Sequence, residues 1–154
     1  MTMTSTDRIQ KSTMIRAPRS RVWRALTDAK EFGTWFGVEP AGTFAVGARV
    51  QGKILHKGYE DLPFEITIEK MEPEKLFSFR WHPYPMDPSI DYSKEPTTLI
   101  EFTLEEAAEG TLLTVTESGF DRIPLARRAK AFEMNDKGWA GQMKAIDAYL
   151  NRAK

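Results

Sequence analysis

Apolar and polar residues alternate with a period of two through most of the chain between residues 49 and 117. Alternation of this kind predicts strands that form a sheet with one buried and one solvated face. The apolar positions of these segments are Val50, Ile54, Phe64, Ile66, Ile68, Phe77, Phe79, Trp81, Ile100, Phe102, Leu104, Leu113 and Val115. The apolar face has to be covered by another element, which restricts the possible folds to a few.

The segment from Pro124 to the C-terminus has the period of a helix, and it is the one element large enough to cover that face. Its apolar stripe comprises Leu125, Ala129, Phe132, Trp139, Met143, Ile146 and Leu150. Asp136 interrupts the stripe and is expected to face solvent. At 1.5 Å per residue the helix would be on the order of 40 Å long. A helix is narrower than six strands, so the sheet must curl around it.

Two short helices are predicted ahead of the sheet. A first strand over residues 9–16 ends before Pro18, which suits the first turn of a helix that continues to Thr27. Asp28 followed by Glu31 resembles a capping box and starts a second short helix. The sequence therefore predicts an α+β fold: a curved antiparallel sheet of about six to seven strands, wrapped around a long C-terminal helix, with two short helices after the first strand.

The connection from Pro83 to Pro96 contains four prolines and is long for a hairpin loop. Proline cannot pair in a central strand, so this segment is expected to be an ordered flap or a rim loop. It also carries four apolar or aromatic side chains, which would suit a contact in a homodimer if they were exposed. They are Tyr84, Met86, Ile90 and Tyr92.

Charge and composition exclude several classes of function. The 154 residues include 22 basic and 22 acidic side chains, so no net field attracts nucleic acid or an anionic membrane. The most basic run is interpreted as the solvated face of the first short helix; its members are Arg16, Arg19, Arg21 and Arg24. The absence of cysteine excludes disulfides, iron–sulfur clusters and thiolate chemistry. The N-terminus lacks a signal peptide's apolar core and no segment could cross a bilayer, so a cytoplasmic protein is expected.

Several motifs resemble one known family. They are Ala17-Pro18, Val22 to Asp28, Trp35-Phe36-Gly37, Glu74 to Trp81, Gly110 to Phe120, and Gly138-Trp139. Together they resemble the activator-of-Hsp90-ATPase-like branch of the START-like (SRPBCC) superfamily, over a single domain of residues 9–152 that follows a flexible tail of residues 1–8. The resemblance implies the helix-grip fold, with a cavity between the sheet and the C-terminal helix that the two short helices close at one end. Relatives use this cavity for lipids, hydrophobic metabolites or polyketide-like substrates, and others act as partners of proteins, including chaperones.

Glu117 and His56 are the candidates for chemistry within the hollow. Glu117 shares its parity with Val115, so either its carboxylate points inward, where it would be paired or have a raised pKa, or the strand ends early and it lies at the wet rim. His56 shares parity with Ile54 and faces either the hollow or its open end, whereas His82 is expected to face outward. Neither candidate has the spacing of a metal ligand, so no metal and no cofactor are expected.

The aromatic side chains on the inward faces are interpreted as core residues, some of which line the cavity. The full set expected at the cavity is Trp35, Phe36, Ile54, His56, Phe64, Ile66, Phe79, Trp81, Ile100, Phe102, Val115, Glu117, Trp139 and Met143. Binding of a small hydrophobic, amphipathic or lipid-like ligand is the first hypothesis. The second is a protein-interaction module like the Hsp90 co-chaperones, and the third is an enzyme that uses Glu117 as an acid or base on an apolar substrate.

Overall fold

The computed structural model describes residues 7–60, 62–85 and 89–152. Most of the predicted tail of residues 1–8 lies outside the described residues, although Arg8 already belongs to the first strand. Met86, in the proline-rich connection, also lies outside them.

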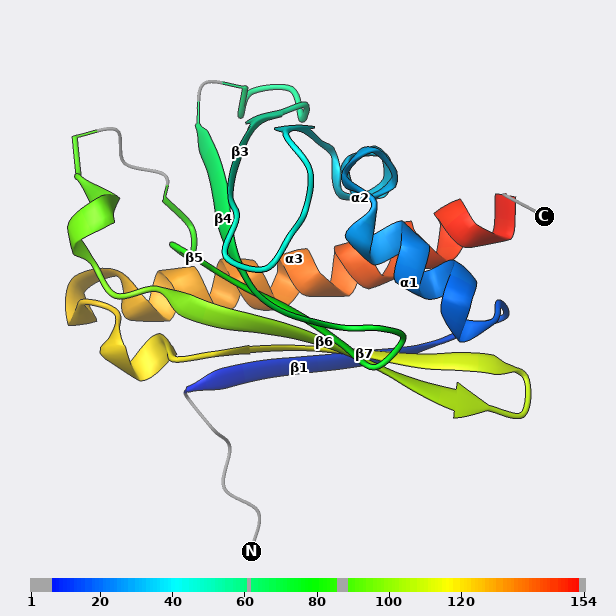
Figure 1. Cartoon of the computed structure of the whole chain (residues 1–154). Coiled ribbons are helices and arrows are strands. Elements are labelled where there is room, and N and C mark those ends of the chain that lie inside the picture. The colour runs from blue at the N-terminus through cyan, green and yellow to red at the C-terminus, as the bar shows by residue number, and fades with distance from the viewer. Residues whose placement is uncertain (1–6, 61, 86–88, 153–154) are drawn as a thin grey trace, which may run out of the picture.

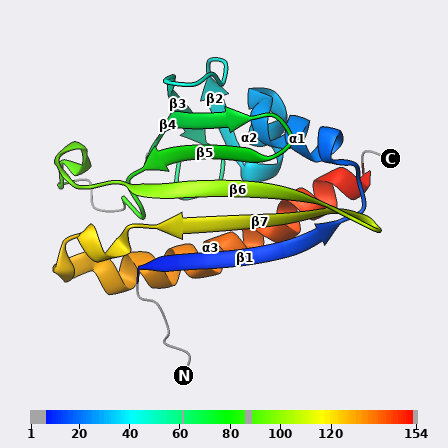
Figure 2. The same cartoon turned by 60° about the horizontal axis from the view of Figure 1, so that its bottom comes forward.

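Seven antiparallel strands form one sheet, in the order β1-β7-β6-β5-β4-β3-β2. Figure 2 looks onto this sheet, with β1 along one edge. The strands are β1 (Arg8–Ile15), β2 (Val38–Ala41), β3 (Arg49–Ile54), β4 (Pro63–Glu72), β5 (Leu76–Trp81), β6 (Thr98–Ala107) and β7 (Gly110–Ser118). The short β2 was not predicted from the sequence. It contains Pro40, and it lies at the edge of the sheet, where a missing N–H leaves no interior pair broken.

Three α-helices accompany the sheet. They are α1 (Arg19–Thr27), α2 (Ala29–Phe36) and α3 (Leu125–Arg152), and two single 3₁₀ turns are η1 (Tyr92–Lys94) and η2 (Phe120–Arg122). The sheet curves along α3, with α1 and α2 towards the C-terminal end of that helix (Figure 1). The predicted α+β helix-grip architecture is therefore confirmed, including the two short helices and the long C-terminal one.

Local sequence signals fix the boundaries of α2. The side chain of Asp28 accepts a hydrogen bond from the backbone N–H of Glu31 at 3.0 Å, as the predicted N-cap requires. Gly37 ends the helix in the left-handed region at φ 91°, which glycine adopts without steric cost. These two ends hold the apolar face of α2, with Phe32, Trp35 and Phe36, against the sheet.

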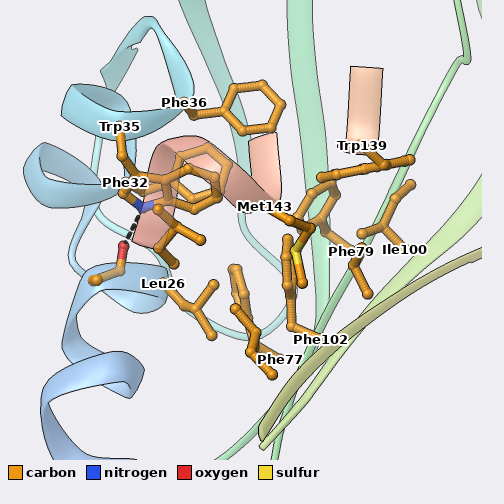
Figure 3. Packing of buried hydrophobic residues seen from close by; sticks show 14 of the residues in the cluster. Leu26, Phe32, Trp35, Phe36, Phe77, Phe79, Ile100, Phe102, Trp139 and Met143 are labelled. Atoms are coloured by element: carbon orange, nitrogen blue, oxygen red, sulfur yellow. Dashed lines mark hydrogen bonds between the residues drawn. The ribbon is translucent and has the colours of Figure 1, made fainter. Parts of the chain in front are cut away.

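The core fills the space between α1, α2, the concave face of the sheet and α3. Phe77, Phe79 and Phe102 have no exposed surface, and the rings of Phe79 and Phe102 lie 6.3 Å apart on the same face. Figure 3 shows these rings facing the side chains of α2, together with Trp139 and Met143 from α3. The strand parities on which the sequence analysis depends are confirmed, since Ile66, Ile68, Ile100 and Val115 are buried as well.

The first turn of α3 departs from the predicted apolar stripe. Leu125 is 79% exposed, and Ala129 is exposed too. The inner side of this turn is used by Arg127, whose guanidinium donates to the backbone oxygens of Pro83 and Tyr84 at 2.8 and 3.2 Å. Apolar packing begins one turn later, at Ala131, and continues through Trp139 to Leu150.

The basic run on α1 is only partly solvated, which corrects the interpretation of Arg21. Its guanidinium donates to Glu31 at 2.7 Å and lies over the ring of Tyr149, and side-chain exposure is 21% for Arg21 and 18% for Glu31. Arg24 and the Tyr149 hydroxyl also donate to Glu31, at 2.9 and 2.7 Å. Burial opposes ionisation, but the hydrogen bonds from Tyr149 and Arg21 prevail and lower the pKa of Glu31. This cluster joins α1, α2 and α3.

Candidate functional site

A pocket of about 870 Å³ opens beside the filled core, between β3, β4, the end of β5, the C-terminal half of α2 and the middle of α3. Such a volume lies within the range of small-molecule pockets. The residues that line it are Trp35, Phe36, Val38, Arg49, Ile54, His56, Tyr59, Leu62, Phe64, Glu65, Trp81, His82, Tyr84, Pro85, Ile90, Asp91, Tyr92, Ser93, Asn135, Gly138, Gly141, Gln142 and Ala145.

Aromatic rings make up the inner wall of the pocket. Phe36 packs near Phe64 and Trp81, with ring centroids 6.0 Å apart in each pair. Trp81 stacks on Trp139 at 5.6 Å with an interplanar angle of 25°. Trp35 is fixed from behind, because its indole N–H donates to the backbone oxygen of Ala25 at 2.8 Å (Figure 3). A flat apolar molecule would meet a rigid aromatic surface here.

The wall contributed by α3 has a different composition. Gly138, Gly141 and Ala145 supply almost no side chain, and Asn135 and Gln142 supply amides. The Asn135 amide nitrogen donates to both carboxylate oxygens of Glu117, at 3.0 and 3.2 Å. The Gln142 amide nitrogen donates to the backbone oxygen of Phe36 at 2.9 Å. The small residues leave open space in front of this wall, and both amides are held by hydrogen bonds to protein acceptors.

Glu117 lies directly behind this wall. It is fully buried, and its carboxyl group accepts five hydrogen bonds from four side chains. The indoles of Trp81 and Trp139 donate at 2.8 Å each, to Oε2 and Oε1 respectively. The Thr98 hydroxyl donates to Oε2 at 2.5 Å, and Asn135 completes the set. Four elements, β5, β6, β7 and α3, are thus tied together at one carboxyl group.

Burial without a counter-ion raises the pKa of Glu117, and the hydrogen bonds from Thr98 and both tryptophans offset only part of this effect. Within the described residues, no basic side chain forms an ion pair with it. Only one of the four hydrogen-bond partners of Glu117 can accept a hydrogen bond from its protonated carboxyl group. Indole N–H and amide NH₂ groups only donate, whereas the hydroxyl of Thr98 can also accept, so the proton belongs on Oε2 facing Thr98.

The comparison with protein families decides the identity of the domain. Residues 16–151 match the family model described as activator of Hsp90 ATPase homolog 1-like protein. The chain belongs to this family. A search of curated proteins finds no match. The family membership agrees with the resemblance that the sequence motifs indicated.

Solved structures share this fold. Protein MLL2253 from Mesorhizobium loti superposes with a TM-score of 0.75 at 22% identity, over 96% of this chain and 98% of that one. The Aha1 dimer from Colwellia psychrerythraea gives 0.70 at 18% identity, over 93% and 95%. DynU16, a protein of the dynemicin biosynthetic locus, gives 0.72 at 27% identity over 96% of this chain. The chain spans 48% of DynU16, about half its length.

The activator-of-Hsp90-ATPase-like domain places the residues proposed from its sequence in two groups. Trp35, Phe36, Ile54, His56, Phe64 and Trp81 line the pocket. Trp139 lines a side chamber of about 130 Å³ that shares Phe36 and Trp81 with the main pocket. The others do not line either space and are buried in the core behind them: Ile66, Phe79, Ile100, Phe102, Val115, Glu117 and Met143.

The structure does not bring Glu117 and His56 to a common point. Glu117 is closed off by its four donors, and none of them is His56. His56 lies in the loop after β3, is exposed, and packs its ring against Gly37, where an added Cβ would approach Nε2 to 2.4 Å. His82 corrects the expectation that it faces outward. It follows the last residue of β5, lines the pocket, and its Nε2 lies 3.1 Å from the backbone oxygen of Glu95.

Charged groups at the mouth of the pocket are largely paired. Arg49 contacts Glu65 at 3.0 Å. Burial opposes ionisation of Glu65, but hydrogen bonds from Gln51 and Arg49 lower its pKa overall. Asp91 accepts hydrogen bonds from the backbone and hydroxyl of Ser93. In the described ranges, no group of three or more histidine or acidic side chains converges in a way that could hold a metal ion.

The connection between β5 and β6 forms one rim of the pocket, and Arg127 holds it in place. Besides its bonds to Pro83 and Tyr84, the guanidinium contacts Glu95 at 2.8 Å and lies 4.8 Å from the centre of the Tyr92 ring. One side chain from α3 thereby contacts both ends of the loop.

Among the helices that the structure describes, none is long and apolar enough to span a membrane.

The wall formed by α3 was not predicted from the sequence. Asn135, Gly138 and Gln142 recur at a spacing of three and four residues, and Gly141 and Ala145 lie beside them. This is the period of a helix face, but it consists of small and amide residues instead of apolar ones. The signal was present in the sequence as two glycines within a long helix.

Proposed function

We propose that this protein binds a small hydrophobic or amphipathic molecule in the pocket between α2, α3 and the β3–β5 part of the sheet. The observation that supports this most strongly is the pocket itself, about 870 Å³ with aromatic walls, beside a core of fully buried side chains. Protein interiors are normally close-packed, so a hollow of this size costs dispersion contacts. A ligand would recover them.

The two glycines of α3 support the same proposal. A Cβ added at Gly138 or Gly141 would meet no heavy atom within 4 Å, so packing does not require glycine at either position. Glycine inside a helix is about 1 kcal/mol less favourable than alanine. Both positions face the pocket, where the absence of side chains enlarges it. The sequence therefore gives up helix stability at the place where space is gained.

Exposed apolar side chains around the mouth would receive such a ligand. Tyr59 and Ile90 line the pocket and are 44% and 39% exposed, and Leu55 nearby in the sequence is 53% exposed. Apolar surface at a pocket mouth suits the entry of a poorly soluble molecule. DynU16, which shares the fold, is named for a biosynthetic locus, and this is consistent with a small-molecule role.

Binding is favoured over catalysis because of the position of Glu117. An acid or base has to come within hydrogen-bond reach of its substrate. The carboxyl group is fully buried behind Trp81 and Asn135, and all its contacts are with protein donors. Glu117 holds the pocket-lining side chains Trp81 and Asn135 in place, and the ligand contacts those side chains.

Native mass spectrometry of the purified protein, combined with titration of a neutral apolar dye such as Nile red, tests this proposal. We expect either a co-purified small molecule or saturable binding of one dye per chain, with quenching of tryptophan fluorescence because Trp35 and Trp81 line the pocket. If no molecule co-purifies and no dye binds up to its solubility, the proposal fails. The interaction-module hypothesis, which the family name and the Aha1 dimer suggest, would then take first place.

A further inference from the structure

The two amides on the α3 wall carry chemical information about the ligand. Asn135 and Gln142 both line the pocket, and both donate their NH₂ groups to protein acceptors. An amide has one donor end and one acceptor end. Each amide nitrogen is directed to a protein acceptor, and the carbonyl oxygen beside it is available to the pocket as an acceptor.

The orientation of each amide follows from what its partner can do. Gln142 faces the backbone oxygen of Phe36, which only accepts, so the amide nitrogen must point there. Asn135 faces Glu117 Oε1 at 3.0 Å. The indole of Trp139 also donates to that oxygen, and any proton on the carboxyl group belongs on Oε2 facing Thr98. The Asn135 amide nitrogen thus points at the carboxyl group, 3.0 Å from Oε1 and 3.2 Å from Oε2.

In the part of the chain that the structure describes, no group donates a hydrogen bond to Asn135 Oδ1 or Gln142 Oε1. The two residues are seven positions apart, which is two turns, or about 10 Å along the helix axis. Between them lie Gly138 and Gly141, whose missing side chains leave access to both oxygens. The α3 wall thus presents two fixed hydrogen-bond acceptors at either end of a smooth surface.

We propose that the pocket selects a neutral, largely aromatic molecule that carries hydroxyl or N–H donors towards its two ends, which Asn135 and Gln142 accept. This inference rests on the proposed function and specifies its ligand class. The guanidinium that lines the pocket, Arg49, is already paired with Glu65, so the pocket does not favour an anion. Asn135 and Gln142 act as specificity-determining residues, and Glu117 acts as a positioning residue for Asn135.

The test uses three rigid probes of nearly equal size: para,para-dihydroxybiphenyl, its monomethyl ether and its dimethyl ether. Methylation removes one donor at a time and leaves the aromatic surface unchanged. One hydrogen bond changes affinity by about 2- to 10-fold. Isothermal titration calorimetry should give the tightest binding for the diol, an intermediate value for the monoether and the weakest for the diether.

Gln142→Met keeps the length and volume of the side chain but removes its oxygen. This substitution should reduce the preference for the diol over the diether by about 2- to 10-fold, and leave the affinity for the diether within about twofold of the wild-type value. Gln10→Met is the matched control. It makes the same change on β1, at an exposed side chain that donates to Thr116 and does not line the pocket. It should leave all three affinities unchanged.

The outcomes separate the two proposals. If all three probes bind the wild-type protein equally, the pocket binds apolar molecules but Asn135 and Gln142 do not accept hydrogen bonds from them. Only this inference is then overturned. A full preference for the diol in Gln142→Met would also overturn it. If no probe binds, the proposed function fails and this inference fails with it. The wild-type series decides the question even if a variant does not fold.

Discussion

Two halves of the same concave sheet face differ in what lies opposite them. Around Phe77, Phe79 and Phe102, the sheet meets α2 and the apolar face of α3, and the side chains have no exposed surface. Around Phe64 and Trp81, the sheet meets the small and amide residues of α3, and a pocket of about 870 Å³ results. Both halves of the sheet contribute aromatic side chains. We infer that the residues of the helix, more than those of the sheet, decide where this domain is hollow.

Truncation in the filled half should have the largest effect on stability. Phe102→Ala removes a side chain with no exposed surface that packs on Phe77, Phe79 and Trp139. We expect a loss of about 3–5 kcal/mol in the free energy of unfolding, because the rigid surroundings cannot close the cavity. Urea denaturation measures this value. Tyr59→Ala, at the mouth of the pocket, is the control and should cost less than about 1 kcal/mol; equal costs would remove the distinction between the halves.

Glu117 lies at the boundary between the halves, and Glu117→Gln should cost about 1–3 kcal/mol. An amide NH₂ in place of Oε2 would face the indole N–H of Trp81 and leave that donor without an acceptor. Removal of a buried charge by itself would be neutral or slightly stabilising. Four converging donors reverse that expectation. A variant as stable as the wild-type protein at pH 7 would contradict this interpretation of the cluster.

The difference in stability between the wild-type protein and Glu117→Gln should depend on pH. Burial raises the pKa of Glu117, so the folded state holds its proton above the unfolded pKa of about 4.3. Above that pH the unfolded state binds fewer protons, and the contribution of Glu117 to stability falls as pH rises through the folded pKa. Urea melts from pH 4 to 8 should therefore give the wild-type protein its largest advantage over Glu117→Gln at the acid end. If the stability of the wild-type protein relative to Glu117→Gln instead grew with pH, the pKa of Glu117 would be lowered and not raised.

Arg21→Ala tests the cluster that joins the three helices near the filled half. It removes one of three donors to the Glu31 carboxylate and the cation over Tyr149. We expect a loss of about 1 kcal/mol in the free energy of unfolding, which is more than a solvated surface arginine would give. Arg16→Ala, at an exposed position ahead of α1, should be neutral. Equal effects of the two changes would restore the interpretation of the basic run as solvated surface.

The smallest effect should be a gain in stability in the hollow half. Gly138→Ala adds a methyl group where no heavy atom lies within 4 Å. The higher helix propensity of alanine should raise the free energy of unfolding by about 0.5–1 kcal/mol. Thermal denaturation measures the change. A destabilised variant would mean that Gly138 is required for packing, and the argument that glycine is there for the pocket would fail.

The sequence was sufficient for every strand of the sheet except β2, and for the direction of the side chains on the predicted strands. Alternation put Phe79, Phe102 and Val115 on one face because side chains in a strand point to opposite sides in turn. The same rule allowed Glu117 to point inward but left the wet rim as an alternative; the side chain is fully buried. Its partners could not be predicted, because Trp81, Thr98 and Asn135 come from three other elements whose approach depends on the curvature of the sheet.

The pocket wall was harder to predict for a different reason. The period of α3 identified its apolar side, which packs in the core. Hydrophobic periodicity does not identify a helix face that lines an open pocket. His82 was assigned to the outer face because the alternation was extended one residue past the end of β5 at Trp81. Arg127 donates to the backbone oxygen of Pro83, 44 residues away in the sequence, and no local signal predicts this contact.

Binding of Nile red to the wild-type protein, Gly138→Phe and Gly138→Ala tests whether the ligand occupies the space that α3 leaves open. Phenylalanine at this position would project into the empty space beside Asn135 and Gln142 without displacing a neighbour of its Cβ. We expect Gly138→Phe to fold with a melting temperature close to that of the wild-type protein and to bind the dye at least about tenfold more weakly. Gly138→Ala should retain most of the affinity of the wild-type protein for the dye. Undiminished binding to a folded Gly138→Phe would contradict it, because the ligand would then lie outside the pocket that α3 leaves open.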